Sequence, residues 1–157
     1  MAHIKYSESK NSYRNKNAIH NVIHYINDSS KLIHNIKGAL GCNYASSKSI
    51  TKDMLDVQKC FNKKKGKRIN HFTVCFSPAE ENILQINDYL TIGYKIASFF
   101  PDEYQIFFAL HENTDNMHIH FAMNPVSFVT GKKYHWQKKD SYMLKSYISS
   151  IIDDFMD

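Results

Sequence analysis

Apolar and polar positions follow two different periods along the N-terminal half of the chain. The opening residues AHIKYSES alternate, as in a strand, whereas the apolar residues that follow recur at helical spacing and predict a helix over about residues 15–27. The apolar positions of this helix are Ile19, Val22, Ile23 and Ile26. Residues 38–47 (GALGCNYASS) are typical of a loop. Met54 and Phe61 lie on the apolar face of a second predicted helix, which ends at a basic run.

The middle of the chain predicts a buried strand followed by a helix. The segment RINHFTVCF (Arg68–Phe76) is rich in β-branched and aromatic residues, as a central strand is. Ser77 and Pro78 are typical of a helix start, because proline is tolerated in the first turn. We expect this helix to run to about Phe99, where Pro101 ends it.

The C-terminal third predicts a hairpin, an irregular segment and a final helix. Residues 104–111 (YQIFFALH) and 118–124 (HIHFAMN) are two strands joined by the short polar stretch ENTDNM. An irregular strand pair is expected around Gly131. The inward positions of the final helix are Leu144, Ile148, Ile151 and Phe155. The whole pattern predicts one α+β domain, in which helices cover a central antiparallel β-sheet.

Length and composition narrow the class of protein. A chain of 157 residues with 43% hydrophobic and 22% charged residues is long enough for one folded globular domain. Its three cysteines, Cys42, Cys60 and Cys75, are far apart and predict neither a disulfide framework nor a zinc finger, which suits a reducing cytoplasm. The N-terminus lacks an apolar signal region, and no run approaches the ~20 apolar residues of a membrane span. We therefore expect a soluble cytoplasmic protein without membrane insertion.

The charge of the chain favours a polyanionic partner. The net charge is +5 and the pI is about 9.0. Lysine and arginine gain affinity for nucleic acid by releasing counterions from the phosphates. The basic run Lys63–Arg68 (KKKGKR) agrees with such a partner, although a charge run is also typical of a solvated loop.

Three histidines of the predicted hairpin form a candidate metal site. Side chains two residues apart in a strand share a face, so His118 and His120 lie with Cα atoms roughly 6.5–7 Å apart. The hairpin brings His111 beside them. Three neutral nitrogen donors suit one divalent ion, such as Mn, Mg or Zn, and leave coordination positions open for a substrate oxygen, as in a catalytic site. The alternative is that these are ordinary histidines of a chain that contains nine.

Two acidic side chains lie in the same hairpin. Glu112 and Asp115 are candidates to orient a ligand histidine, or they cap the turn. A divalent ion with open positions can act as a Lewis acid on a phosphoryl oxygen, and such chemistry needs a nucleophile.

At these residues the chain resembles a known family, the relaxases or mobilisation nucleases, single-tyrosine members of the HUH endonucleases. The family has a histidine, then after seven residues a histidine-x-histidine pair, and then an asparagine; His111, His118, His120 and Asn124 stand in this arrangement. The stretch HFTVCFSPAEE resembles the family's second motif, and the similarity runs from about residue 15 to the C-terminus. The resemblance implies an HUH-relaxase-like fold for residues 1–157, as a catalytic domain that is either a natural minimal protein or lacks a further C-terminal region.

The first motif of the family is a tyrosine in an N-terminal helix that leads into a turn with a basic residue. The segment AIHNVIHYINDSSKL fits this motif and identifies Tyr25 as the nucleophile by resemblance. With ~100° per residue, Tyr25 lies at the flank of the apolar helix face, where a phenol can reach solvent. Tyr6 and Tyr13 are the alternatives, and the other possibility is a Tyr25 ring packed at the edge of the core.

Two positions depart from the family pattern. Cys75 stands where the family has a serine that helps to hold DNA, a task that Ser77 is a candidate to take over. Asn113 stands where the family has an acidic residue that tunes a metal-binding histidine, which leaves Glu112 or Asp115 for that task. Neither departure removes the core chemistry.

The function implied by the resemblance is strand-specific nicking and rejoining of DNA at a plasmid or conjugative-element transfer origin. The intermediate would be a 5′-phosphotyrosyl link, and the partners would be single-stranded or supercoiled origin DNA with relaxosome accessory and coupling proteins of a bacterial cytoplasm. Arg68, Lys132 and Lys133 are candidates to track the DNA backbone, and Trp136 to stack unpaired bases, with a solvated or core role as the alternative for each. The competing hypotheses are an HUH replication initiator or transposase, and a non-catalytic DNA-binding module that a metal stabilises.

Overall fold

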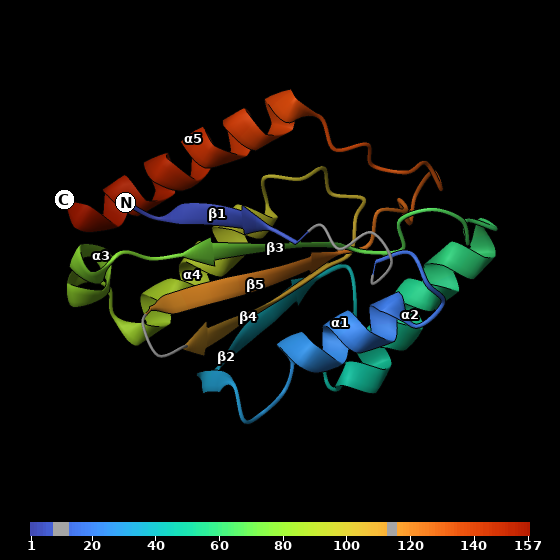
Figure 1. Ribbon diagram of the computed structural model, residues 1–157, viewed down its shortest axis with the longest axis horizontal. Helices are drawn as coiled ribbons and strands as arrows, with labels where there is room; N and C mark the ends of the chain where they lie inside the picture. The colour runs from blue at the N-terminus through green and yellow to red at the C-terminus, as the bar shows by residue number, and fades with distance from the viewer. Residues whose placement is uncertain (8–12, 113–115) are drawn as a thin grey trace.

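The structure is a computed structural model that describes residues 1–7, 13–112 and 116–157. Its elements follow one another in the order β1 His3–Tyr6, α1 Ala18–Ile26, β2 Leu32–Leu40, α2 Ser47–Cys60, β3 Asn70–Cys75, α3 Pro78–Ile83, α4 Ile86–Ala97, β4 Ile106–Glu112, β5 Met117–Met123 and α5 Lys138–Met156 (Figure 1).

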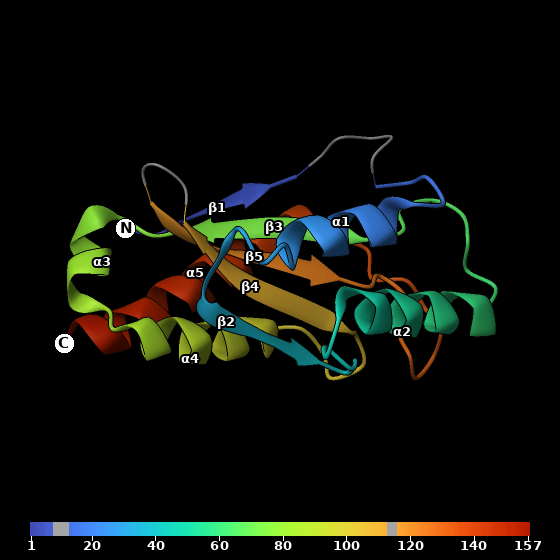
Figure 2. The ribbon, with the colours of Figure 1, turned by 90° about the horizontal axis from the view of Figure 1, so that it is seen from below.

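The five strands form one sheet in the order β1-β3-β5-β4-β2, and each neighbouring pair is antiparallel. Helices α1 and α2 lie on one face of this sheet, and α4 and α5 lie on the other (Figure 2). This arrangement confirms the predicted α+β fold with a helix-covered antiparallel sheet. None of the helices in the described parts of the chain is long and apolar enough to cross a bilayer.

The sheet face toward α4 and α5 carries the larger apolar core. Its buried strand residues are Ile36, Phe72, Val74, Ile106, Phe108, Leu110, Ile119, Phe121 and Met123. The rings of Phe72 and Phe121 stack across two neighbouring strands, with centroids 4.8 Å apart and planes 4° apart. Burying such a side chain stabilises the folded chain by about 1.5–3 kcal/mol.

Glycine allows α4 to lie close to the sheet. A Cβ atom added at Gly93 would lie 2.3 Å from Phe108 Cε2, well inside contact distance. On β2, a Cβ atom at Gly38 would lie 2.6 Å from the ring of Tyr94, which belongs to α4. Larger side chains at these two positions would push helix and sheet apart.

The opposite face of the sheet is only partly covered. Under α1 and α2 the strands present Phe107 and the small residues Ala109 and Ala122, which pack with buried apolar residues of both helices. Beyond this cover the same strands carry the histidines. On this face β4 and β5 therefore change along their length from apolar side chains under the helices to histidines beyond them.

Two sequence predictions are wrong. Residues 38–40, expected in a loop, belong to β2, which runs from Leu32 to Leu40. The sequence pattern does not predict this strand because it is irregular: its register with β4 shifts between Leu32 and Lys37, and His34 and Asn35 have φ of 49° and 54°. Such an irregularity breaks the alternation on which strand prediction depends.

The helix expected from Ser77 to Phe99 is two helices, α3 and α4. Leu84 and Gln85 are extended, with ψ of 134° and 160°. The chain restarts a helix there because the Asp88 carboxylate accepts a hydrogen bond from the backbone N–H of Gln85 at 2.7 Å. The predicted helices near residues 15–27 and 54–61, the hairpin and the final helix are confirmed, and the segment around Gly131 contains one bridge, Val126 to Lys133.

Candidate metal centre and adjoining tyrosine

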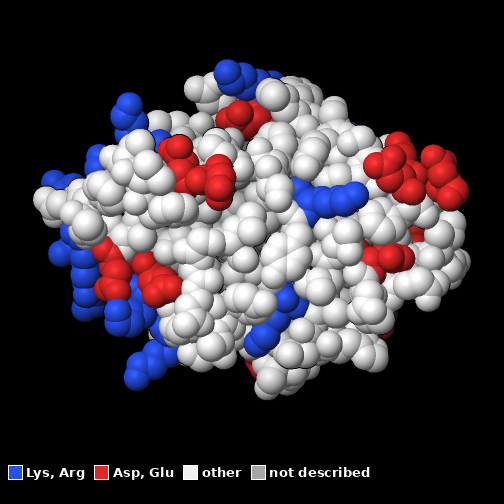
Figure 3. Space-filling model, turned by 180° about the vertical axis from the view of Figure 1, so that it is seen from behind, with Lys and Arg blue, Asp and Glu red and all other residues white. Residues whose placement is uncertain are grey.

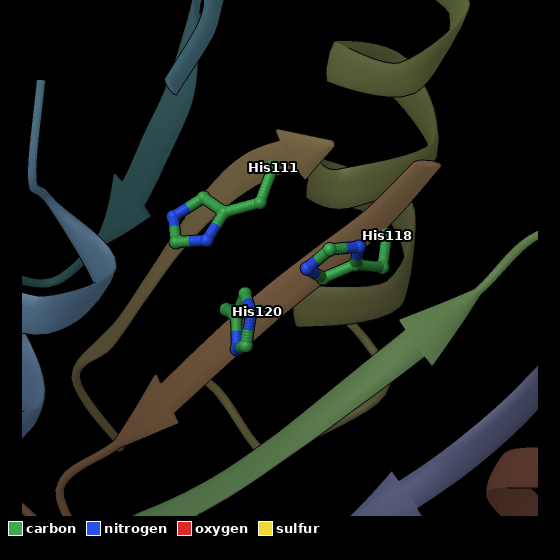
Figure 4. Close-up of side chains that lie close together, drawn as sticks. All are labelled: His111, His118 and His120. Atoms are coloured by element: carbon green, nitrogen blue, oxygen red, sulfur yellow. The ribbon is translucent and has the colours of Figure 1, made fainter. Parts of the chain in front are cut away.

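The three histidines converge as the hairpin predicted. His111 of β4 and His118 of β5 are direct cross-strand partners, and His120 lies two residues further along β5 on the same face. All three are buried, and their candidate ligand atoms lie within 4.8 Å of one another. Figure 4 shows the three imidazoles on one side of the two strands.

Each of these imidazoles uses one ring nitrogen for a protein partner. His111 Nε2 donates to the carbonyl of Ile26 at 2.6 Å, and His118 Nδ1 donates to the carbonyl of Asn116 at 3.1 Å. His120 Nδ1 lies 2.9 Å from His71 Nε2 and 3.1 Å from the Thr73 hydroxyl. The second nitrogen of each ring is left for a metal, as in histidine ligands that a neighbouring group holds in one tautomer.

The fit to a divalent ion has independent support at His120. Its Nε2 atom is buried and has no hydrogen-bond partner among the described residues. An unsatisfied buried nitrogen is costly unless something binds it. Burial lowers the pKa of His111, His118 and His120, that of His120 to about 2, so all three rings are neutral near pH 7 and offer lone pairs.

Tyr25 lies beside the histidines. Its ring is 45% exposed, and its centroid lies 5.5 Å from that of His120 and 6.0 Å from that of His111. The ammonium of Lys31, in the turn after α1, lies 4.0 Å from the centre of the Tyr25 ring. The flank of the apolar helix face, where Tyr25 was predicted, therefore faces the site.

The two alternative tyrosines have other surroundings. Tyr6 packs its ring against Trp136, with centroids 5.5 Å apart. The hydroxyl of Tyr13 lies 3.1 Å from His71 Nδ1. Neither ring contacts the ligand histidines directly, in contrast to Tyr25.

The C-terminal end of α1 is fastened to its surroundings. The hydrogen bond of His111 reaches the carbonyl of Ile26, the last residue of the helix. The next residue, Asn27, donates to the Ser47 hydroxyl at 2.9 Å and accepts from Lys37 Nζ at 3.1 Å. These bonds fix the turn that carries Tyr25 to β4, α2 and β2.

Tyr25, His118 and His120 line one pocket of about 250 Å³. The rest of its lining comes from His3, Lys5, Ser7, Thr73, Cys75 and Asn116. With Lys31 close by, the pocket places two ammonium groups near neutral imidazoles, which favours a phosphate.

Sequence reasoning missed His71 and Thr73. Both lie on β3, on the face that carries the ligand histidines, because Thr73 pairs with His120 and His71 pairs with Ala122. Burial, and then the charge of His111, lower the pKa of His71 to about 4. The sequence feature that could have identified them is the alternation of His71, Thr73 and Cys75 along a strand predicted to be central, which places all three side chains on one face.

Of the other residues predicted near the site, one lines the pocket, two lie elsewhere and two fall outside the described residues. Cys75 lines the pocket, and burial raises the pKa of its thiol. Ser77 instead caps α3, where its hydroxyl accepts from Glu80 N–H at 3.3 Å. Glu112 is exposed, and strand alternation directs it to the face opposite His111. Asn113 and Asp115 lie outside the described residues.

Asn124 is placed away from the histidines. It is fully buried, and its amide donates to Gln105 Oε1 at 2.9 Å and to the Met54 carbonyl at 3.2 Å. Its Oδ1 accepts from Gln58 Nε2 at 2.9 Å. Asn124 thus ties the end of β5 to α2.

The predicted backbone-tracking residues lie near the basic run. Arg68 is buried, and its Nε donates to Gln58 Oε1 at 2.7 Å. Lys133 Nζ donates to the carbonyls of Lys65 and Lys67, and burial lowers its pKa. Lys132 is exposed. Lys and Arg side chains crowd the left of Figure 3, the end of the molecule where α2 ends in Figure 1.

The fold and the pocket together define a class of site. Three neutral imidazoles able to hold a divalent ion, a tyrosine against them and two lysines nearby are groups suited to phosphate-ester chemistry. Comparison with known families agrees with this class. Residues 25–155 match the family described as relaxase, MobA/VirD2-like, nuclease domain, and the chain belongs to this family.

Two relatives and one solved structure illustrate the similarity. Two Staphylococcus aureus proteins named Protein rlx are 27% and 28% identical over 109 residues, which are 69% of this chain and 32% and 33% of the relatives. The chain thus spans about a third of the length of these relatives. A solved structure described as "Molecular Basis of Vancomycin Resistance Transfer in Staphylococcus aureus" superposes on this chain with a TM-score of 0.66 at 11% sequence identity. The match covers 99% of this chain and 92% of the chain in the solved structure. That likeness shows a shared fold.

Proposed function

We propose that this domain nicks and rejoins one strand of DNA at a plasmid or conjugative-element transfer origin, through a 5′-phosphotyrosyl link to Tyr25. The observation that carries the proposal is the position of the Tyr25 ring, 5.5 Å from that of His120 in a pocket lined by both. Membership of a nuclease-domain family supports DNA as the substrate.

A divalent ion held by His111, His118 and His120 would supply Lewis acidity for an oxygen of the scissile phosphate. Lys5 and Lys31 attract the phosphate toward the pocket and offset its charge. The exposed phenol of Tyr25 has room to approach phosphorus, while the fastened end of α1 limits its orientation.

In the cutting step the Tyr25 oxygen forms a bond to phosphorus and the bond from phosphorus to the 3′ oxygen breaks. The phenol gives up its proton, and the departing 3′ oxygen takes one up. The reverse attack by the 3′ hydroxyl releases Tyr25 and rejoins the strand. One site therefore serves both cutting and joining.

The experiment is capture of the covalent adduct. The protein is incubated with Mn²⁺ and a randomised pool of single-stranded oligonucleotides, and adducts are isolated under denaturing conditions and sequenced. We expect wild type to form an adduct and Tyr25→Phe to form at least about 10³-fold less, because the nucleophile is gone.

Tyr142→Phe is the matched control, since Tyr142 is 64% exposed on α5 and should leave adduct formation unchanged. Adduct formation by Tyr25→Phe at the wild-type level would exclude Tyr25. The sequences recovered distinguish a transfer origin from the replication origin of an initiator. Metal binding without any adduct would favour a non-catalytic module.

A further inference from the structure

A second pocket lies at the end of β1, next to the histidine site. It has a volume of about 280 Å³, and its lining includes Tyr6, Lys67, Asn70, His71, Phe72 and Trp136. Pairing between β1 and β3 ends at Tyr6 and Phe72, followed by one hydrogen bond from Ser7 N–H to the His71 carbonyl at 3.2 Å. The start of β3 therefore forms one side of the pocket. Pockets for drug-sized ligands begin at roughly 300 Å³, so this one suits a single small ring system.

Aromatic side chains form one wall of this pocket. The rings of Tyr6 and Trp136 meet at 68° with centroids 5.5 Å apart, and Trp136 rests on Phe72 at 5.8 Å. Trp136 Nε1 donates to the Ser141 hydroxyl at 2.8 Å, which fixes the indole. Tyr6 remains 37% exposed. An aromatic wall that is already held in place stacks a base with little loss of side-chain freedom.

A polar group in the same lining lacks a partner. Asn70 is 6% exposed, and its Nδ2 atom is buried without a hydrogen-bond partner among the described residues. A buried amide donor without an acceptor is costly, so a ligand that carries an acceptor is favoured. Nucleobases combine aromatic faces with such acceptors on their edges.

The pocket is joined to the histidine site by two residues. His71 lines the pocket, and its Nε2 lies 2.9 Å from Nδ1 of His120. Ser7 lines both pockets. Strand alternation directs Asn70 and Phe72 to the face opposite the histidines, so the two pockets meet at the edge of β3 where β1 ends. A DNA strand with a phosphate at the histidines would pass Ser7 and turn around this edge to place a base at the aromatic wall.

We propose that the pocket between Tyr6, Asn70 and Trp136 takes one unpaired nucleobase of the strand whose phosphate lies at the histidine site. This inference rests on the proposed function, because it takes single-stranded DNA as the ligand. It assigns the pocket a positioning role: a base held there places the adjacent phosphate at Tyr25.

The test compares two oligonucleotides with equal charge. One is oligodeoxythymidylate, and the other has the same length and backbone but abasic residues throughout. Binding is measured without metal to Tyr25→Phe protein, which cannot form the covalent link. Trp136 is the only tryptophan, so its fluorescence reports directly on the pocket.

We expect the thymidylate strand to bind roughly tenfold or more tightly than the abasic strand and to quench Trp136, and the abasic strand to leave the fluorescence unchanged. Adding Tyr6→Ala should remove most of the preference for bases without changing affinity for the abasic strand. Phe128→Ala is the matched control, because Phe128 is 38% exposed and does not line the pocket.

A second variant, Trp136→Leu, read by anisotropy of a labelled strand, tests the wall if Tyr6→Ala folds poorly. Equal loss of affinity for both strands in these variants, or no loss for either, would overturn the proposal. Quenching by the abasic strand would also do so. If the wild-type protein forms the covalent adduct but shows no preference for the thymidylate strand, this inference is refuted and the proposed function stands. If the thymidylate strand is preferred but no adduct forms, the proposed function is refuted and this inference stands.

Discussion

Strands β3, β4 and β5 present very different side chains to the two faces of the sheet. Toward α4 and α5 they carry phenylalanine, leucine, isoleucine and valine, in contact with two helices. Toward the other face, β4 and β5 carry phenylalanine and alanine under α1 and α2, and the three strands carry histidine, threonine and cysteine at the pocket. Adjacent residues of one strand therefore belong in turn to the apolar core and to the candidate site.

This division explains how buried histidines are tolerated. Their neutral rings are removed from water, and one nitrogen of His120 is unsatisfied. Such groups lower stability unless a ligand compensates. The apolar face supplies the stability that permits this arrangement. Substitutions of neighbouring residues that point to opposite faces should therefore change stability by different amounts.

The largest expected effect comes from the apolar face. Phe121→Ala should lower the free energy of unfolding by about 3–5 kcal/mol, because it removes a fully buried ring stacked on Phe72. Urea denaturation without metal measures it. The adjacent His120→Ala should cost clearly less, since it also removes an unsatisfied nitrogen. Equal losses from the two variants would contradict the division between the faces.

An intermediate effect is expected from the metal. At an ion concentration about 100 times the dissociation constant, binding should raise the free energy of unfolding by about 2.7 kcal/mol. Thermal unfolding with Mn²⁺ and with a chelator measures the difference. His111→Ala should lose it, whereas His135→Ala, a histidine outside the cluster, should keep it. Stabilisation that survives in His111→Ala would place the ion elsewhere.

A smaller effect is expected from His71. His71→Ala should weaken metal binding about 10- to 100-fold, because the His120 ring loses the partner that orients it. His71→Gln, which retains a hydrogen-bonding group, should recover part of the affinity. Calorimetric titration gives both values. An unchanged affinity in His71→Ala would show that Thr73 alone orients His120.

The hairpin could be predicted because its information is local. The period of two along residues 118–120 gives a shared face, and the short separation from His111 gives the pairing. Helix α1 could be predicted equally well, since the four apolar residues whose spacing predicts it are all buried. Tyr25 came from resemblance, and its flank position followed from helix geometry.

Other features depend on contacts that single segments do not specify. The irregular strand β2 is stabilised by pairing with β4. Its two residues with positive φ interrupt the alternation of apolar and polar positions, so the sequence pattern does not predict a strand there. His71 becomes important only because β3 lies beside β5. Asn124 matches a family motif, and its hydrogen bonds to Met54 and Gln58 of α2 depend on the packing of that helix against the end of β5, which the motif alone does not specify.

The hydrogen bond from His111 to the Ile26 carbonyl has a mechanical consequence. A DNA strand held covalently on Tyr25 would transmit any pull to the last turn of α1. That load would pass through Ile26 into β4, an interior strand, and through Asn27 into α2 and β2. Tension on the attached DNA strand would thus be distributed over β4, α2 and β2, and α1 would stay docked on the domain.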